Sequence, residues 1–324
     1  MDLILVGCGR ISQRHVEAIS ATPGLEIVQV CDVDQERARV VGERLGVPWT
    51  CSIESIADSD VVTIATPSGL HPRHVAEVAS SATAPMIVCE KPVSLTIREL
   101  VEMYEHVSQA GKRLLPVFQN RYNPLVVLLR DLVRSGNLGA VYQCVVNVFW
   151  NRSDDYYRDS WHGTIDRDGG ILFTQASHYI DLLIFLFGYP VRVVGSGGNA
   201  RGLPTQDTVS AVFEFSGGVC SLNATVNTFN RTYRTEATLI AQRGTIRVAG
   251  TNLNTIEFWD VEGMEKPDID FTLDHVYGKG HDTMYSHLVK GRFEEFPSFE
   301  DVYAGIAAAE QLAYGWPNGA GLPS

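Results

Sequence analysis

Short apolar runs alternate with amphipathic segments over the first 118 residues. The apolar runs span residues 3–6, 26–30, 61–65, 86–89 and 114–118. Runs this short and apolar throughout suit strands of a parallel sheet that helices cover on both faces. Between them, apolar residues recur at helical spacing over residues 35–45, 71–81 and 96–111. The repeated β-α-β pattern predicts an α/β fold that opens with a doubly wound Rossmann domain, residues 1–118.

The rhythm changes after residue 119. An amphipathic helix is expected over 124–136, a long strand over 140–150, a polar loop over 151–168 and one helix over 171–188. Strand patterns then follow one another from residue 191 to residue 259. This predicts a C-terminal α+β domain, residues 119–324, with a large, open, mostly antiparallel sheet. One face of such a sheet must be covered, so a homodimer or homotetramer is expected.

Composition narrows the class of partner. The net charge is −12, which argues against nucleic acid or an anionic membrane as a partner held by a general field. The first strand pattern begins at residue 3, and polar residues interrupt the longest apolar tract, so neither a signal peptide nor a membrane span is expected. The six cysteines form no CxxC pair. Buried, reduced thiols in a cytoplasmic protein are the simplest interpretation, and no metal site is expected.

The segment "GCGRIS" lies between the first predicted strand and helix. Gly7 can make the tight turn, Gly9 can let the backbone approach a pyrophosphate, and Ser12 is small enough for the third position. Asp32 follows the second strand and is placed to bind a ribose hydroxyl. A glycine turn followed by a capping Asp would explain Asp32 but not the joint spacing. The carboxylate favours NAD over NADP, although Arg37 lies near it in sequence.

Two further loops are expected at the carboxyl edge of the parallel sheet, where such folds bind ligands. One, "ATPSGLHPRH", would turn Thr66, Pro67 and His71 toward the cofactor, although His71 could equally be a polar residue at a helix start. The other, "CEKP", places Lys91 at the mouth of the sheet. Pro92 restricts Lys91 to extended conformations and allows a cis bond. A solvated surface lysine is the alternative.

The predicted second domain supplies a candidate base. His178 lies on an otherwise apolar helix, and abstraction of a hydroxyl proton needs a base of near-neutral pKa. The alternative is a core histidine paired with Asp181, three residues on. Residues 121–167 contain six arginines and no lysine, which suits recognition of carboxylate or phosphate. Arg121 is the best candidate for that contact, and Tyr122, Asn123, Trp161 and Gln175 could meet a sugar.

The motifs "GCGRIS", "ATPSGLHPRH", "CEKPVSLT" and "GGILFTQASHYIDLL" resemble the Gfo/Idh/MocA family of sugar and cyclitol dehydrogenases over essentially the whole chain. The resemblance implies that Lys91 touches the reacting hydroxyl and that His178 is the acid/base. Many members carry Asp four residues before that histidine, where this chain has Thr174. Whether Lys91 is itself the base, or a cation that stabilises the developing alkoxide while His178 takes the proton, stays open; we favour the second.

Within the family, "QNRYNP", "VNVFWNR" and the segment around His178 most resemble the enzymes that oxidise C3 of UDP-N-acetylglucosaminuronate with NAD. Alternatives are the same chemistry on a free sugar, a cyclitol or a keto-deoxysugar nucleotide, or a non-catalytic dinucleotide-binding regulator. The expected cofactor contacts are Gly7, Gly9, Arg10, Ile11, Asp32, Thr66, Pro67, His71, Glu90, Lys91 and Gln119. The expected substrate contacts are Arg121, Tyr122, Asn123, Trp161, Thr174, Gln175 and His178.

Overall fold

A computed structural model describes residues 1–158, 161–269 and 278–314. The chain folds into two compact units, which are described separately below. The first contains residues 1–119 and 280–299, and the second contains residues 120–279 and those from 300 onward. The expected division into 1–118 and 119–324 is therefore corrected at one point. Residues 280–299 return to the first unit, because their helix packs on the Rossmann helix α1 (Ser12–Ser20).

The first unit is built on a six-stranded sheet in the order β3-β2-β1-β4-β5-β6. Every strand pair in this sheet is parallel, which confirms the predicted Rossmann domain. The apolar strands are almost completely buried, as the continuous apolar runs predicted. The two-residue β3 was not predicted. The strands are β1 (Asp2–Val6), β2 (Glu26–Cys31), β3 (Trp49–Thr50), β4 (Val61–Ile64), β5 (Met86–Cys89) and β6 (Arg113–Pro116).

Local capping explains where α2 and α4 begin and where α4 ends. Asp34 accepts hydrogen bonds from two backbone N–H groups at the start of α2, and Thr96 accepts one at the start of α4. Gly111, just after α4, has a φ of 66°, as a helix-ending glycine should. The helices are α1 (Ser12–Ser20), α2 (Gln35–Leu45), α3 (His71–Ser81), α4 (Ile97–Gln109) and α8 (Gly280–Val289). Sequence reasoning assigned no helix to the α8 segment.

The second unit is built on a seven-stranded sheet in the order β13-β12-β11-β7-β10-β9-β8. All neighbouring strands are antiparallel except β7 and β10, so the sheet is mostly antiparallel, as predicted. The parallel pair places Cys220 beside Cys144 at the centre of the sheet. The strands are β7 (Val141–Phe149), β8 (Arg192–Gly198), β9 (Thr208–Phe215), β10 (Gly218–Thr225), β11 (Arg234–Ala241), β12 (Gly244–Ala249) and β13 (Thr255–Val261).

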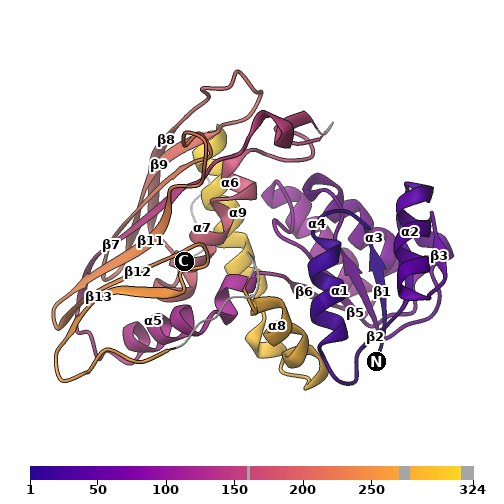
Figure 1. Ribbon diagram of the computed structural model, residues 1–324, viewed down its shortest axis with the longest axis horizontal. Helices are drawn as coiled ribbons and strands as arrows, with labels where there is room; N and C mark the ends of the chain where they lie inside the picture. The colour runs from indigo at the N-terminus through magenta and orange to yellow at the C-terminus, as the bar shows by residue number, and fades with distance from the viewer. Residues whose placement is uncertain (159–160, 270–277, 315–324) are drawn as a thin grey trace. The chain divides into compact units, whose positions relative to one another are not determined.

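Helices line one face of this sheet (Figure 1). They are α5 (Pro124–Arg134), α6 (Ile171–Thr174), α7 (Ser177–Phe187) and α9 (Phe299–Tyr314). The single helix expected over 171–188 is interrupted between α6 and α7. There the Ala176 N–H bonds to the carbonyl of Ile171, five residues back, and the regular ladder is broken. The predicted helix is thus two helices, with Thr174 and Gln175 at the break.

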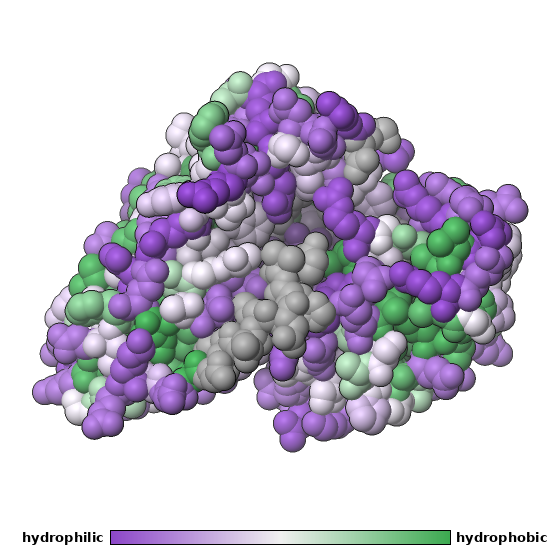
Figure 2. Space-filling model, viewed as in Figure 1, coloured by the Kyte–Doolittle hydropathy of each residue, from purple (hydrophilic) through white to green (hydrophobic). Residues whose placement is uncertain are grey.

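The opposite face of the seven-stranded sheet is partly apolar. Val194, Val219, Ile240 and Phe258 are each between 38% and 49% exposed. Figure 2 shows hydrophobic side chains among hydrophilic ones along this part of the molecule, at the left of the view. A polar row crosses the same face, where Asn223 donates to Asn147 and Asn147 donates to Glu236.

All six cysteines are free thiols, and five of them are buried; Cys51 is exposed. Burial raises the pKa of both Cys8 and Cys31 to about 12, so these thiols stay protonated at neutral pH. Over the part of the chain that the structure describes, every helix is too short or too polar to cross a membrane.

Candidate active site

The glycine loop after β1 is held against the end of β2. The Gly7 N–H donates to the carbonyl of Cys31 at 2.8 Å, and the Cys8 N–H donates to Asp32 Oδ2 at 2.7 Å. The other carboxylate oxygen of Asp32 accepts from the Asp34 N–H at 2.8 Å. The acidic residue that the spacing singled out therefore lies directly beside the loop. It retains lone pairs for further donors, because an ionised carboxylate has about four acceptor positions.

Gly7 and Gly9 differ in what surrounds them. Gly7 has a φ of +98°, and a Cβ there would lie 2.5 Å from the carbonyl oxygen of Ala65. A Cβ on Gly9 would meet no atom within 4 Å. Only glycine fits the first position, whereas the second borders open space on the side where a pyrophosphate would approach. Ser12, at the third position, is buried and donates to the Gly9 carbonyl at 2.6 Å.

The loop after β4 is fixed by its own histidines. His71 is buried, with Nδ1 2.7 Å from the Pro92 carbonyl and Nε2 2.9 Å from the Thr66 carbonyl. His71 was expected to contact the cofactor; instead both ring nitrogens face backbone carbonyls, and the side chain braces two loops. Burial lowers the pKa of His71. Thr66 Oγ1 lies 2.9 Å from His74 Nδ1, and Pro67 is half-buried beside it.

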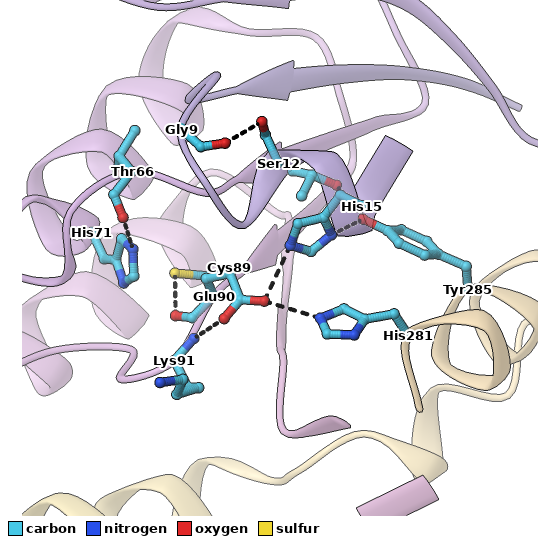
Figure 3. A network of polar contacts seen from close by, with 11 residues as sticks. Gly9, Ser12, His15, Thr66, His71, Cys89, Glu90, Lys91, His281 and Tyr285 are labelled. Atoms are coloured by element: carbon cyan, nitrogen blue, oxygen red, sulfur yellow. Dashed lines mark hydrogen bonds and ion pairs between the residues drawn. The ribbon is translucent and has the colours of Figure 1, made fainter. Parts of the chain in front are cut away.

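The loop after β5 carries Lys91, and the Lys91–Pro92 peptide bond is cis, as the sequence allowed. Glu90 is buried beneath it and accepts from the Lys91 N–H through Oε2 at 3.0 Å (Figure 3). Its other oxygen, Oε1, faces the Nε2 atoms of His15 and His281 at 3.1 Å and 3.3 Å. Glu90 was expected to contact the cofactor, but both of its carboxylate oxygens bond to groups inside the first unit.

The cluster of His15, Glu90 and His281 contains the atom types that bind transition metals, all within 4.8 Å of one another. Hydrogen bonds account for the arrangement, because each imidazole lies at N–H···O distance from one carboxylate oxygen. Burial by itself would raise the pKa of Glu90. The bonds from the two histidines outweigh that effect and hold the pKa well below its usual range, so the carboxylate is ionised.

Gln119 is the last residue of the first of the two segments, 1–119 and 280–299, that form the first unit. It is buried, and its Oε1 has no hydrogen-bond partner within the described parts of the chain. A Cβ on Gly280, the first residue of α8, would lie 2.2 Å from the Gln119 carbonyl oxygen, so the two backbones are in close contact. An orphaned amide, an open Gly9 and a carboxylate at the end of β2 fit a dinucleotide along this sheet edge. Arg10, which is exposed, and Ile11, half-buried, complete the loop.

In the second unit, His178 lies in the first turn of α7 and is 7% exposed. The alternative in which Asp181 partners this histidine is not what the structure shows. Both carboxylate oxygens of Asp181 bond to Arg121, at 2.7 Å and 2.9 Å. His178 therefore lies near the start of α7, and the carboxylate of Asp181 on the same helix is bonded to Arg121.

Arg121 was expected to be an anion-binding arginine and is instead part of a buried ion cluster. Its Nη1 donates to Asp301 at 2.8 Å, and its guanidinium also lies 4.9 Å from the centre of the Phe185 ring. Burial raises the pKa of Asp181, and Arg121 opposes that rise. All three guanidinium nitrogens are bonded to these two aspartates, so the sequence prediction for Arg121 is wrong in its role.

The remaining substrate candidates divide into two groups. Asn123 caps α5, accepting from the Leu125 N–H at 2.9 Å and donating to the Asn252 carbonyl, and Tyr122 is buried. This cap is a structural role that the sequence prediction missed. At the break before α7, Thr174 Oγ1 lies 2.5 Å from Gln175 Oε1. Trp161 is half-buried against His162, with ring centroids 3.7 Å apart.

Sequence reasoning missed His15, His281 and Tyr285. The Tyr285 hydroxyl lies 2.7 Å from His15 Nδ1, and both side chains are fully buried. A signal for His15 was present, since it falls between Ser12 and Ile19 on the buried face of α1. No signal linked it to a helix that lies more than 260 residues further along the chain.

A six-stranded parallel sheet with this glycine loop, joined to a second α+β unit, defines the class of NAD-binding oxidoreductases. Family models match both parts of the chain. Residues 1–118 match the oxidoreductase family with an NAD-binding Rossmann fold, and residues 126–251 match the GFO/IDH/MocA C-terminal domain. The chain belongs to the Gfo/Idh/MocA family and is an NAD-dependent oxidoreductase.

Solved structures agree over nearly the full length. The WlbA dehydrogenase of Bordetella pertussis, in complex with NADH and UDP-GlcNAcA, is 30% identical with a TM-score of 0.84, covering 96% of this chain and 94% of that one. The WlbA dehydrogenase of Chromobacterium violaceum, with the same ligands, is 29% identical with a TM-score of 0.86, covering 99% and 97%. The inositol 2-dehydrogenase of Rhizobium meliloti is 25% identical over 94% of each chain.

The two loop glycines should respond differently to alanine. Gly7→Ala should lower the free energy of unfolding by more than about 2 kcal/mol, because it combines an unfavourable φ with a backbone clash. Gly9→Ala should change the free energy of unfolding by less than about 1 kcal/mol, because the added Cβ meets no protein atom. It should weaken NADH binding, because the Cβ would fill the space through which the pyrophosphate approaches the backbone. Urea unfolding and NADH fluorescence titration measure the two effects. Equal stability losses would contradict this geometry.

Arg121→Met should lower the free energy of unfolding by about 3–5 kcal/mol at neutral pH, because Asp181 is left buried without its partner. Burial would then raise the folded-state pKa of Asp181 unopposed, so the folded protein binds a proton that the unfolded chain releases as the pH rises. The loss should therefore shrink below the usual carboxyl range and grow above it.

Arg130→Met is the matched control for Arg121→Met. Arg130 also lies over Phe185, but it pairs with the largely exposed Asp131. Arg130→Met should therefore lower the free energy of unfolding by less than about 1 kcal/mol. Similar losses in the two variants, measured by urea unfolding at several pH values, would argue against a buried ion cluster.

Proposed function

We propose that this chain oxidises a hydroxyl of a sugar nucleotide, C3 of a UDP-N-acetylhexosaminuronate, with NAD as hydride acceptor. The observation that carries the proposal is the edge of the first unit, where the glycine loop, Asp32 and the Lys91 loop follow strands β1, β2 and β5 of one parallel sheet. The two WlbA enzymes, solved with NADH and UDP-GlcNAcA, support this substrate class through their full-length similarity.

NAD, when bound, accepts the hydride from the carbinol carbon. The chain's own residues handle the proton and the charge. In this proposal His178 removes the hydroxyl proton, and the Lys91 ammonium stabilises the alkoxide that develops as the proton leaves. The division is compatible with the state of Asp181, three residues after His178, because both of its carboxylate oxygens bond to Arg121. Asp32 accepts from the ribose hydroxyls and thereby favours NAD over NADP.

The substrate contacts proposed here are those at the break between α6 and α7. Thr174 stands where many relatives carry Asp, so a neutral hydroxyl lies near the base in place of a second carboxylate. Gln175 is buried, with its Nε2 3.5 Å from the Tyr156 hydroxyl and its Oε1 against Thr174. These amide and hydroxyl groups match the acetamido and hydroxyl groups of an amino sugar, and Trp161 offers a flat apolar surface.

A second candidate is the same oxidation on a cyclitol or free sugar. The similarity to the inositol 2-dehydrogenase of Rhizobium meliloti, which extends over 94% of both chains, favours it. The two candidates differ in whether the nucleotide is needed.

A substrate panel with NAD, followed by absorbance at 340 nm, separates these candidates. Turnover is expected with a UDP-N-acetylhexosaminuronate and not with myo-inositol or glucose. Lys91→Met and His178→Asn should each lower kcat by about 100-fold or more while leaving NADH affinity within about 2-fold. Turnover of inositol alone would favour the second candidate, and full activity in both variants would remove the catalytic assignment.

The same assay with NADP examines Asp32. Asp32→Ala should narrow the preference for NAD, because it removes the carboxylate that repels a 2′-phosphate. An unchanged ratio of kcat/KM for the two cofactors would show that Asp32 does not contact the ribose.

We also propose that the helix-free face of the seven-stranded sheet is covered by a second copy of this chain. The support is the partly apolar strip of Val194, Val219, Ile240 and Phe258, which lies beside the polar row from Asn223 to Glu236. A mixed face of this kind suits a self-complementary interface, where apolar contacts and paired polar groups alternate.

Val219→Asp and Ile240→Asp should shift the protein toward monomer in analytical ultracentrifugation, because each places a charge in the proposed interface. Val40→Asp is the control, since Val40 is similarly exposed, at 48%, but lies on α2 of the first unit. A wild-type monomer at micromolar concentration, or an equal effect of the control, would contradict the proposed interface.

A further inference from the structure

We propose that Glu90 is a positioning residue for Lys91, and that His281, supplied by α8 from the far end of the chain, completes this support. The inference rests on the proposed role of Lys91 in the reaction. Glu90 lies directly before Lys91, and its carboxylate binds the Lys91 N–H at 3.0 Å (Figure 3). A rotation of the Glu90 side chain would release that N–H.

The carboxylate is fixed from its other side by two imidazoles. A carboxylate has only acceptor positions, so His15 and His281 must both carry a proton on Nε2 to donate to Oε1. In a neutral His15 ring, Nδ1 then accepts from the Tyr285 hydroxyl at 2.7 Å. The Tyr285 oxygen in turn lies 3.2 Å from Thr63 Oγ1, on strand β4. Together these hydrogen bonds hold the Glu90 carboxylate in one orientation.

A second support lies on the other side of Lys91. His71 contacts the Pro92 carbonyl at 2.7 Å and the Thr66 carbonyl at 2.9 Å, and the Glu90 N–H donates to the Ile64 carbonyl at 3.0 Å. The backbone is therefore held immediately before and immediately after Lys91. A lysine whose main chain is fixed at both neighbours loses less freedom when its ammonium is placed against a substrate.

Stability alone is a poor reason for burying this carboxylate. Glu90 is 5% exposed and His15 and His281 are fully buried, and an apolar trio of the same volume would pack without the cost of desolvating a charge. The arrangement instead provides an acceptor for one backbone N–H at the residue where orientation matters.

The structure offers a matched control on the same helix. Asp282, next to His281, pairs with Arg14 of α1 and so helps to attach α8 without touching Glu90. Asp282→Asn should remove the ion pair with Arg14 while His281 stays bonded to Glu90 and Lys91 stays oriented, whereas Glu90→Gln should disturb Lys91. If Glu90→Gln acted only by weakening the fold, the two variants would have the same effect on Lys91.

The test uses reductive ¹³C-methylation and NMR, since the chain has only five lysines, at 91, 112, 266, 279 and 290. Lys91→Arg assigns the Lys91 dimethylamine signal in the full-length protein. In Glu90→Gln that signal should move toward the random-coil position or broaden, and in Asp282→Asn it should stay within one linewidth of wild type. An unmoved signal in Glu90→Gln, or an equal shift in Asp282→Asn, would overturn the proposal.

A second pair of variants covers the case in which Glu90→Gln fails to fold. His281→Leu removes the donor to Glu90, and His281→Gln keeps an N–H donor at that position. The Lys91 signal should shift in the first variant and be restored in the second; equal signals in the two would overturn the proposal. These readouts need no sugar, so they stand apart from the substrate panel. On an accepted substrate, Glu90→Gln should lower kcat by about 10-fold or more with NAD KM within about 2-fold.

Discussion

Parallel pairing of β1, β4 and β5 is the constraint on which the rest of the first unit depends. Because the three strands run in the same direction, the loops that follow them all leave the sheet at one edge. The glycine loop, the Thr66 loop and the Lys91 loop are thereby neighbours, although about 80 residues separate the first from the last. The cross-links between them, from Cys8 to Asp32 and from His71 to Pro92, hold in place an edge that the sheet topology has already assembled.

Each unit contains a buried ionic cluster close in sequence to one of the proposed catalytic residues. In the first unit, Glu90 is compensated by two imidazoles and a backbone N–H beside Lys91. In the second, Asp181, which lies on the same helix as His178, is compensated by Arg121. The two solutions leave different charges behind. The Glu90 cluster sets one carboxylate against two imidazoles, while the Arg121 cluster contains one guanidinium and two carboxylates, of which Asp301 is partly exposed.

Hydrophobic periodicity predicted most of the helices and strands. It succeeded where the residues within an element determine its type and its ends. The bounds expected for α2 and α3 agree with those observed, because the signals of both helices are local: Asp34 caps the start of α2, and Pro72 lies in the first turn of α3. The break between α6 and α7 was missed because the sequence stays apolar across it. The β7–β10 parallel pair and the return of α8 depend on contacts between distant segments, which no local pattern records.

The predictions for the candidate site succeeded and failed for the same reason. Spacing correctly placed Asp32 beside the glycine loop, since that contact joins consecutive strands. For Arg121, Asn123 and His71, the sequence indicated a polar residue at a notable place but not its partner. Those partners lie up to 180 residues away, as for Arg121 and Asp301, and they turn apparent ligand contacts into internal bonds. A side chain's type limits what it can bind; the fold decides whether it is still available.

The chain passes between the two units three times, after residues 119, 279 and 299. A gene that exchanged its second half with that of a relative at the first of these crossings would import a foreign α8, and with it a foreign residue at position 281 facing Glu90. Such an exchange would separate α8 from the Glu90 loop that it contacts in this chain, because nearly 200 residues lie between the two in the sequence. The first unit is therefore not one continuous stretch of sequence that could be exchanged by a single crossover.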